Sequence, residues 1–372
     1  MDRHPPPAPP PPIDASPRDK PDRTGARRTA GRRVGIKDVA HAANVSLGTV
    51  SNVLNRPEIV AETTRTRVLD VIDSLGYVRA EGARQLRGWA ARVIAVLVQD
   101  LANPFFTALA AGVEQAAREA DLGILVCVGT REPAEVARHL ALLTSHQVRG
   151  AVLTSGEGVG STVAAFRRNA VPFVIADQSA AQPGSCSVGI DDIAGGHAAV
   201  RHLIERGHRS IALVSGPDRL QQVRDRLRGA YSAVAEAGLP TDSLREVPCR
   251  ALTVSAGRDA GHRLLGMSVR PTAVFCANDL LALGLMQALY EAGLRVPEDI
   301  AVIGYDDIEF AASAIVPLTS VRRPAVAMGR HAGRLLIEDT SPTRTGQEHA
   351  HVVLQPELVV RRSTMAAPAR HT

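Results

Sequence analysis

The sequence predicts an N-terminal all-α helix-turn-helix headpiece followed by a two-lobed α/β core built on doubly wound parallel sheets. Between residues 34 and 78, apolar residues recur at helical spacing in three short stretches. From residue 91 onward, continuous apolar runs alternate with amphipathic stretches, which is typical of parallel strands covered by helices on both faces. This second part has roughly 270 residues, which is long for one such sheet and fits two similar lobes facing across a cleft.

Residues 1–33 differ from the rest of the chain in composition. They hold nine of the 24 prolines and two Arg-Arg pairs, with scarcely any large apolar residue. Such a stretch cannot bury a core, so we expect a disordered tail, which is either a basic arm with nonspecific DNA affinity or a dispensable extension. The net charge of +5 also lies at this end, because residues 1–90 hold 15 basic and 10 acidic residues, whereas residues 91–372 hold 28 of each.

The headpiece begins with a short helical pattern that breaks at Asn44. Ser46 is a good N-cap for a second helix, and a third helix ends near Gly76. Two short helices joined by a three-residue turn are typical of helix-turn-helix units, whose second helix lies in the major groove of DNA. A three-helix cap with a polar surface is the alternative, which the neighbouring basic region disfavours. The predicted DNA-reading residues are Ser46, Leu47, Thr49, Ser51, Asn52 and Asn55.

The core is predicted from strand-like runs that recur at regular intervals. Nearly all are continuous apolar segments, as expected for strands buried on both faces. The expected strands are 93–98, 123–128, 150–153, 172–176, 187–190, 211–214, 273–276 and 300–304.

Several motifs resemble those of LacI/GalR-type bacterial transcription regulators, in family order from about residue 34 to 364. They include Ile36-Lys37-Asp38-Val39-Ala40, Thr49-Val50-Ser51-Asn52-Val53-Leu54-Asn55, Ala83-Arg84-Gln85-Leu86-Arg87-Gly88, Asn103-Pro104-Phe105-Phe106, Arg226-Leu227-Arg228-Gly229 and Gly304-Tyr305-Asp306-Asp307. The resemblance implies a core similar to periplasmic binding proteins. It also implies an effector-controlled homodimer, most often a repressor, that binds double-stranded operator DNA with pseudo-palindromic half-sites.

The resemblance further implies that residues 79–90 form a hinge helix or linker in which Ala83 and Leu86 contact DNA. Leu86 would wedge into the minor groove at the operator centre and bend the duplex, or else pack as a linker leucine on Trp89. Gly82 costs about 1 kcal/mol relative to alanine in a helix, so the hinge should depend on DNA and on the partner subunit for its order.

The expected domain boundaries follow from these features. They are a tail at 1–33, a DNA-binding domain at 34–78, a hinge at 79–90, a core at 91–364 and a C-terminal tail at 365–372. Within the core, we expect lobe 1 at about 91–190 plus 320–350, and lobe 2 at about 191–319 plus 351–364.

Ligands in open α/β sheets bind beyond the carboxyl ends of the strands. This rule and the family resemblance indicate overlapping sets of effector-binding residues. A guanidinium such as Arg226, held against carboxylates, can bind vicinal hydroxyls while an aromatic face covers a ring, so we expect a sugar or sugar derivative. Arg323 stands where some sugar-responsive relatives carry glutamine. Its positive charge means that a phosphorylated sugar remains a second possible effector. The alternatives are an N-cap role for Asp279 and solvated loop carboxylates for the other aspartates. The candidate effector-binding residues are Phe105, Phe106, Asp177, Asp191, Arg226, Leu252, Asp279 and Arg323.

Neither a metal nor a cofactor is expected. The four cysteines lack CxxC spacing, and the pair His349 and His351, on one face of a strand, has no cysteine or carboxylate next along that face. No apolar run approaches the ~20 residues of a membrane-spanning helix, and no secretory signal is visible. We therefore expect no membrane partner and a cytoplasmic, nucleoid-associated protein.

Two other classes of function are alternatives to a regulator. An enzyme of the open α/β class is disfavoured because the GxGxxG, GxxxxGK[ST] and GxSxG motifs are absent from the sequence. A solute-binding protein of the same core fold is the remaining alternative, and the attached helix-turn-helix argues against it. No heptad repeat follows residue 364, so we expect a dimer.

Overall fold

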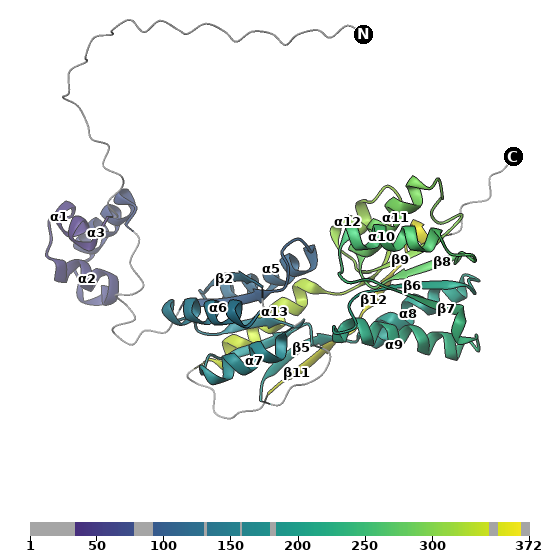
Figure 1. The fold of residues 1–372 in the computed structure, drawn as a ribbon. Coiled ribbons are helices and arrows are strands. Elements are labelled where there is room, and N and C mark those ends of the chain that lie inside the picture. The colour runs from purple at the N-terminus through teal and green to yellow at the C-terminus, as the bar shows by residue number, and fades with distance from the viewer. Residues whose placement is uncertain are drawn as a thin grey trace, which may run out of the picture. The chain divides into compact units, whose positions relative to one another are not determined.

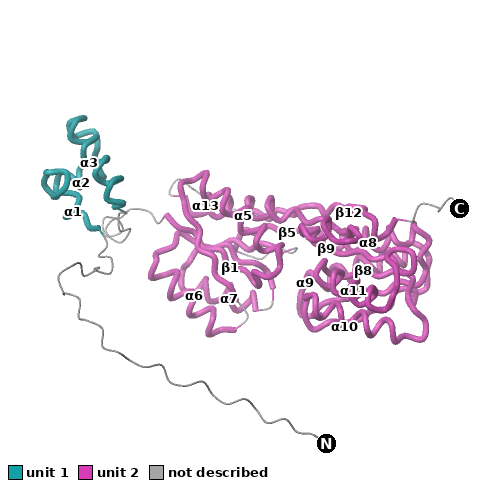
Figure 2. Tube along the Cα trace, turned by 90° about the horizontal axis from the view of Figure 1, so that it is seen from above, with its two compact units in different colours: residues 1–89 teal, residues 90–372 magenta. Residues whose placement is uncertain are grey.

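The computed structural model describes residues 34–77, 92–129, 132–156, 158–178, 184–341 and 349–365. The chain divides into two compact units, residues 1–89 and residues 90–372 (Figure 1, Figure 2). The predicted N-terminal tail and hinge, with Ala83 and Leu86, lie outside the described residues, as does nearly all of the predicted C-terminal tail. In the described part of the chain, no helix has both the length and the apolar character needed to span a bilayer.

The first unit is the predicted three-helix headpiece. Its helices are α1 (Ile36–Ala42), α2 (Leu47–Asn55) and α3 (Glu62–Leu75), with a short 3-10 turn, η1 (Pro57–Ile59), before α3. They pack around one small centre in which Val39, Val50 and Val68 are fully buried. Gly76 ends α3 in the left-handed conformation, with φ of 60°, which glycine adopts without steric cost.

The second unit contains two six-stranded sheets, which confirms the predicted two-lobed α/β core. Lobe 1 has the strand order β11-β5-β4-β3-β1-β2, and lobe 2 has the equivalent order β12-β10-β9-β8-β6-β7. The strands of lobe 1 are β1 (Val93–Val98), β2 (Gly123–Val128), β3 (Ala151–Thr154), β4 (Phe173–Ala176), β5 (Cys186–Ile190) and β11 (His351–Leu354). Those of lobe 2 are β6 (Ile211–Ser215), β7 (Leu244–Pro248), β8 (Ala273–Cys276), β9 (Ala301–Asp306), β10 (Thr319–Arg322) and β12 (Glu357–Val359).

Helices cover both faces of each sheet, which explains the continuous apolar strands (Figure 1). In lobe 1, α5 (Pro104–Glu119) and α13 (Ala325–Asp339) cover one face, and α6 (Pro133–Ser145) and α7 (Val159–Arg168) cover the other. In lobe 2, α8 (Asp192–Glu205) and α9 (Gln221–Glu236) lie opposite α10 (Val254–Leu265) and α11 (Asp279–Glu291). The short helix α12 (Glu309–Ser313) follows β9, and the 3-10 turns η2 (Thr241–Ser243) and η3 (Arg362–Thr364) complete lobe 2.

The chain crosses between the lobes after β5, after β10 and after β11. The last two crossings lie a few residues later than the expected boundaries at 320 and 351, because β10 pairs within lobe 2 and β11 pairs with β5 of lobe 1. The chain enters lobe 2 for the last time from β11, so β12 runs antiparallel to β10, against the all-parallel expectation. The strands β10, β11 and β12 are short and lie at or near the sheet edge. Polar residues alternate with apolar ones in such strands, so the sequence lacks the continuous apolar run that predicts a buried parallel strand.

Three helix pairs pack so closely that glycine is required at the contact. A Cβ at any of six glycines would lie 1.9–2.1 Å from a carbonyl oxygen of the partner helix. The six occur as reciprocal pairs: Gly112 and Gly329 between α5 and α13, Gly196 and Gly229 between α8 and α9, and Gly257 and Gly284 between α10 and α11. Each pair therefore behaves as one rigid layer, since neither helix can rotate without a backbone clash.

Substitution at one of these contacts should destabilise the core. Gly229→Ala places a methyl group 1.9 Å from the carbonyl oxygen of Ile193 and forces α8 and α9 apart. We expect the free energy of unfolding to fall by about 1–3 kcal/mol in urea denaturation. The control Gly160→Ala adds a methyl group into open space in α7 and should raise it by up to about 1 kcal/mol. Equal effects of the two substitutions would contradict the packing argument.

Candidate functional site

The second helix of the headpiece presents a polar, solvent-facing N-terminus. Ser46 is its N-cap, as predicted, and the Ser46 Oγ accepts a hydrogen bond of 3.0 Å from the backbone nitrogen of Thr49. Ser46, Leu47 and Asn52 are exposed, and Leu47 keeps 44% of its surface in solvent. A single exposed leucine is common on protein surfaces, so the expectation that this face meets DNA rests on the helix-turn-helix arrangement.

Two of the predicted DNA-reading residues are engaged with each other. The Nδ2 group of Asn55 donates to the backbone oxygen of Ser51 at 2.6 Å and to its Oγ at 3.1 Å. Both side chains are half-buried on the last turns of α2. Among the predicted residues that the structure describes, the exposed Ser46, Leu47 and Asn52 are therefore better placed to meet DNA.

A cavity of about 120 Å³ lies between the lobes of the core. Its walls come from the loops after β1, β3 and β4 of lobe 1, and from α9 and the segment before α10 of lobe 2. Six of the eight predicted effector residues line it: Phe105, Phe106, Asp177, Arg226, Leu252 and Arg323. The carboxyl ends of both sheets meet at this point, which is where ligands bind in open α/β folds.

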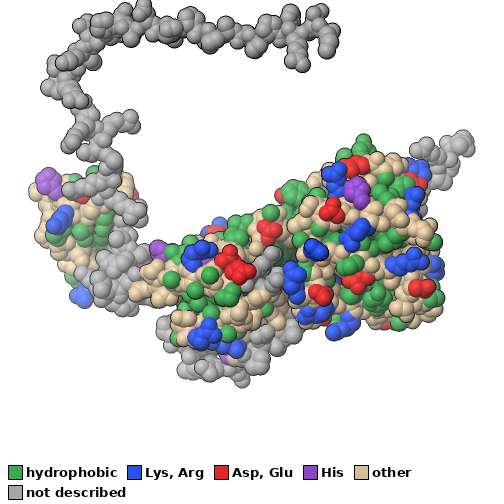
Figure 3. All heavy atoms as spheres, viewed as in Figure 1, with side chains coloured by type: hydrophobic (Ala, Val, Ile, Leu, Met, Phe, Trp, Pro, Cys, Tyr) green, Lys and Arg blue, Asp and Glu red, His purple; other side chains and the backbone are tan. Residues whose placement is uncertain are grey.

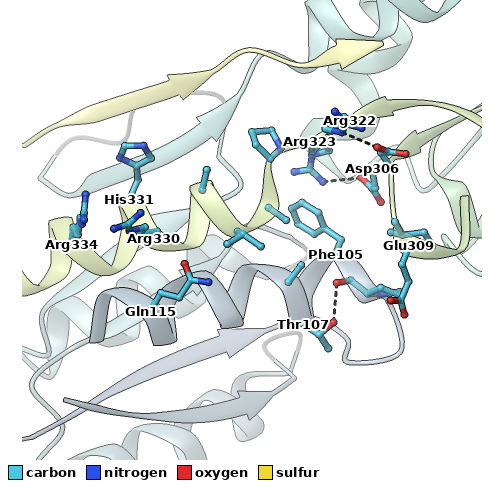
Figure 4. Close-up of a pocket in the computed structure, with 18 residues that line it drawn as sticks. Phe105, Thr107, Gln115, Asp306, Glu309, Arg322, Arg323, Arg330, His331 and Arg334 are labelled. Atoms are coloured by element: carbon cyan, nitrogen blue, oxygen red, sulfur yellow. Dashed lines mark hydrogen bonds and ion pairs between the residues drawn. The ribbon is translucent and has the colours of Figure 1, made fainter. Parts of the chain in front are cut away.

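Arg323 is buried at the crossing from lobe 2 to lobe 1 and pairs with an aspartate of each lobe. Figure 4 shows its pair with Asp306. Its Nη2 group donates to Asp177, at the end of β4, and its Nη1 group donates to the Oδ1 atom of Asp306, at the end of β9, at 3.1 Å. The guanidinium lies over the ring of Phe105, 3.8 Å from the centroid. The ion pairs and the ring hold the guanidinium in one orientation at the cavity wall.

Arg226 forms a second buried cluster on the lobe 2 side. Its Nε group donates to the Oδ1 atom of Asp192 at 2.9 Å, and its Nη1 group donates to the backbone oxygen of Ala277 at 2.6 Å. Its Nη2 atom lies 4.0 Å from the Oδ1 atom of Asp306, so Asp306 faces both guanidiniums. Burial lowers the pKa of Arg226, but the charges of Asp192, Tyr305 and Asp306 outweigh it and hold this pKa above its usual range.

Both guanidiniums, on side chains that line the cavity, keep an unused hydrogen-bond donor. The Nη2 atom of Arg226 and the Nε atom of Arg323 are buried and have no hydrogen-bond partner among the residues that the structure describes. A buried polar group without a partner is costly, because it has lost its water without gaining a replacement. These two atoms are therefore the positions at which a bound molecule could accept hydrogen bonds.

Two predicted effector residues do not line the cavity. Asp191 caps α8, where its Oδ1 atom accepts from the backbone nitrogen of Ala194 at 2.9 Å. Asp279 is buried at the start of α11, where its carboxylate accepts from the hydroxyl of Ser320 at 2.7 Å and from the backbone nitrogen of Ile308 at 2.8 Å. Burial raises the pKa of Asp279 well above its usual range, and the charge of Asp306 adds to this shift.

The structure adds residues that sequence reasoning missed. Asp306, Asn103 and Gln222 line the cavity, and Asp192 holds Arg226. Asp192 directly follows the predicted Asp191, and Asp306 belongs to the family-like motif of residues 304–307. Asp177 and Asp306 have φ of 65° and 105°, a left-handed conformation that non-glycine residues rarely adopt outside functional sites. The direction of their side chains depends on this backbone conformation, which the sequence does not display.

A larger groove of about 830 Å³ runs along α5 and α13 on the other side of Arg323 (Figure 4). Its floor includes Phe105, Asp306 and Arg323, which also line the cavity between the lobes. These three residues therefore form a wall between the cavity and the groove. On the face of the core drawn in Figure 3, basic and acidic side chains are interspersed, without one large basic patch.

Residues 35–80 match the model of bacterial regulatory proteins of the lacI family, and residues 200–364 match that of periplasmic binding protein-like domains. The chain is 32% identical to the HTH-type transcriptional regulator DegA of Bacillus subtilis over 332 residues, which cover 88% of this chain and 97% of DegA. The chain belongs to the lacI family. It is a DNA-binding transcriptional regulator with a small-molecule effector, as the sequence motifs predict.

Solved structures of lacI-family regulators share the whole architecture. A transcriptional regulator CelR–cellobiose complex aligns with a TM-score of 0.66 and 32% identity, over 89% of this chain and all of that chain. A lac repressor dimer bound to operator and to an anti-inducer aligns with a TM-score of 0.77 and 28% identity, over 90% of this chain and all of that chain. The predicted order of headpiece and two-lobed core is thereby confirmed for this lacI-family chain.

The buried carboxyl group of Asp279 should make the stability of this regulator depend on pH. Because its pKa is raised in the folded state, folding takes up a proton above the usual pKa of 3.8, and stability falls as pH rises. We expect the free energy of unfolding, measured in urea, to fall less steeply between pH 5 and 8 in Asp279→Asn than in the wild type. The difference between the two slopes should be up to about 1.4 kcal/mol per pH unit.

Asp299→Asn is the matched control for this experiment. Asp299 is exposed, and its hydrogen bond from Arg295 lowers its pKa to about 2, so it is ionised in both states across this range. Its substitution should leave the pH slope unchanged. Identical slopes for wild type and Asp279→Asn would show that Asp279 is ionised in the fold.

Proposed function

We propose that this lacI-family regulator is a repressor that binds a pseudo-palindromic operator as a homodimer, and that a sugar or sugar derivative binding between its lobes controls this affinity. The observation that carries the effector assignment is the pair of buried, unpartnered donors on two arginines that line the cavity, Arg226 Nη2 and Arg323 Nε. Hydroxyl oxygens can accept from both, and the apolar side chains of Phe106 and Leu252 in the cavity lining can contact the apolar side of a sugar ring.

The charges around the cavity favour a neutral effector over a phosphosugar. The two buried guanidiniums face three buried carboxylates, those of Asp177, Asp192 and Asp306. An added phosphate would therefore meet buried guanidiniums that are already paired with aspartates, at a high desolvation cost, and the two other arginines of the cavity lining, Arg219 and Arg250, are exposed and screened by solvent. The cavity is also small compared with the ~300 Å³ or more of typical ligand pockets, which favours a single sugar ring.

The exposed start of α2 supports the DNA-binding role. The Ser46 cap and the exposed Leu47 lie at the N-terminal end of α2, which is the part of a recognition helix that enters the major groove, and the exposed Asn52 adds a hydrogen-bonding group further along the helix. Leu86 and Ala83 remain proposed contacts at the operator centre. Two headpieces would read two half-sites, as the dimeric lac repressor on its operator suggests.

The wall between the cavity and the groove offers a route for control. Arg323 belongs to the segment that joins the lobes, and it contacts both the effector cavity and the outer surface along α13. Closure of the lobes around a ligand would move this segment, and the ligand would shift the population between two lobe arrangements with different operator affinity.

The effector site can be tested with Arg226→Lys. Lysine keeps the charge but loses the planar fork, so the Nη2 contact and the Nε–Asp192 hydrogen bond cannot both form. We expect the Kd for the effector to rise by about 10-fold to 100-fold in calorimetric titrations with neutral sugars and phosphosugars. Arg228→Lys, at an exposed position of the same helix, should leave the Kd unchanged. Binding of a phosphosugar alone would overturn the neutral-effector assignment.

The operator role can be tested by selecting full-length protein against random duplex DNA at a stated salt concentration. We expect a pseudo-palindrome bound by two chains. Asn52→Ala should weaken specific binding about 5-fold to 150-fold, with little change in nonspecific binding, because a base contact is worth ~1–3 kcal/mol. Leu86→Ala should reduce operator bending, and Ser74→Ala, on the exposed face of α3, should have no effect. Enrichment of no sequence, with or without sugars, would contradict operator binding.

A further inference from the structure

At the end of lobe 1 away from the cavity, three elements bring together a thiol, a carboxylate and an imidazole. Cys186 begins β5, Asp339 ends α13, and His349 lies two residues before β11. The Cys186 Sγ atom lies 3.8 Å from the Nδ1 atom of His349. The ligand atoms of all three side chains lie within 4.8 Å of one another. The histidine pair has no cysteine or carboxylate next along its strand face, which predicts no metal, but the fold brings Cys186 and Asp339 to His349.

We propose that Cys186, Asp339 and His349 form a binding site for a divalent transition-metal ion of the zinc class. A thiolate, an imidazole and a carboxylate are the ligand types that zinc takes from proteins, at about 2.0–2.3 Å. Tetrahedral geometry at those lengths places ligand atoms about 3.5 Å apart, so the thiol and imidazole already stand near the required separation. The carboxylate reaches the ion with a shift on the order of 1 Å or less.

Contacts of neighbouring residues hold the backbone on both sides of the site. The backbone nitrogen of Ser187 donates to the backbone oxygen of Ala350 at 3.0 Å, which ties the residue after Cys186 to the residue after His349. On the helix side, Arg149 donates from Nε to the Oγ1 atom of Thr340 at 2.7 Å and from Nη2 to the backbone oxygen of Ile337 at 3.0 Å. The end of α13 that carries Asp339 is thus anchored to the sheet, and a preorganised site loses less entropy on binding.

Electrostatics and access also suit a cation. Asp339 is the last residue of a 15-residue helix, where the carbonyl groups give the helix end a partial negative charge. Cys186 is 1% exposed, Asp339 is half-buried and His349 is exposed, so the cluster runs from the protein interior to solvent. An ion could enter from the His349 side and keep a water molecule as its fourth ligand.

Metal binding would join three parts of lobe 1. β11 is an edge strand of lobe 1, but it follows β6–β10 of lobe 2 in the sequence, with α13 directly before it. An ion held by Cys186, Asp339 and His349 would link β5, the end of α13 and the start of β11. Because the folded chain alone assembles the site, binding would stabilise the fold by mass action.

The test is a titration of the reduced, full-length protein with Co²⁺, whose bonds to thiolate give a charge-transfer absorption. We expect one Co²⁺ per chain with this absorption, displaced by Zn²⁺. The absorption should vanish in Cys186→Ser, and the affinity should fall at least tenfold in His349→Gln and in Asp339→Asn. Saturating Zn²⁺ should raise the Tm of the wild type by about 5 °C at a hundredfold excess over Kd.

Two matched controls isolate the site. Cys127→Ser removes another buried thiol in lobe 1, and His351→Gln removes the neighbouring imidazole, whose Nδ1 atom lies 2.5 Å from the Ser187 Oγ atom. Both variants should bind Co²⁺ as the wild type does. If Cys186→Ser does not fold, the two surface-facing variants carry the test. No charge-transfer absorption in the wild type, or the same absorption and affinity in the cluster variants and the controls, would overturn the proposal.

Discussion

The buried charge cluster at the junction of the lobes is the constraint on which the regulator's structure depends. Asp306 faces Arg323 and Arg226, and Asp177 contributes a carboxylate from the other lobe. Charges removed from water are tolerated only when they are paired, so each of these side chains requires the others. Since Arg323 lies on a segment that crosses between the lobes, the pairing also fixes how the lobes meet. The effector cavity is lined by the same groups, and its chemistry follows from the residual hydrogen-bonding capacity of the two guanidiniums.

Rigid lobes concentrate motion at the crossings. The reciprocal glycine contacts between α5 and α13, between α8 and α9, and between α10 and α11 leave no space for helices to slide. A ligand that closes the cavity must therefore act through the three connecting segments. Arg323 lies in one of them. A change in its ion pairs would alter both the cavity and the groove, because Arg323 lines both together with Phe105 and Asp306.

Local patterns predicted the headpiece and most of the core, because helical spacing, N-caps and continuous apolar runs are properties of adjacent residues. The Ser46 cap and the strands from β1 to β6 belong to this group. Features that depend on distant residues were not predictable in this way. Asp279 and Asp306 both lie at the carboxyl ends of strands, yet Asp279 turns toward Ser320 and Ile308, while Asp306 faces the cavity from a left-handed backbone conformation. The partners of His349 show the same limit, since Cys186 is 163 residues away in the chain.

Helix α13 connects the two ends of lobe 1. It begins directly after Arg323 and Pro324, at the wall of the effector cavity, and ends at Asp339, in the cluster with Cys186 and His349. Its 15 residues span about 22 Å, and its glycine contacts with α5 make the pair one stiff layer. A metal ion at the far end would anchor this layer to β5 and β11. Because the same layer carries the crossing segment at its near end, such an anchor would favour one position of Arg323 over others. Metal binding and effector binding would then be coupled through a single rigid helix, and reciprocally, as linkage requires.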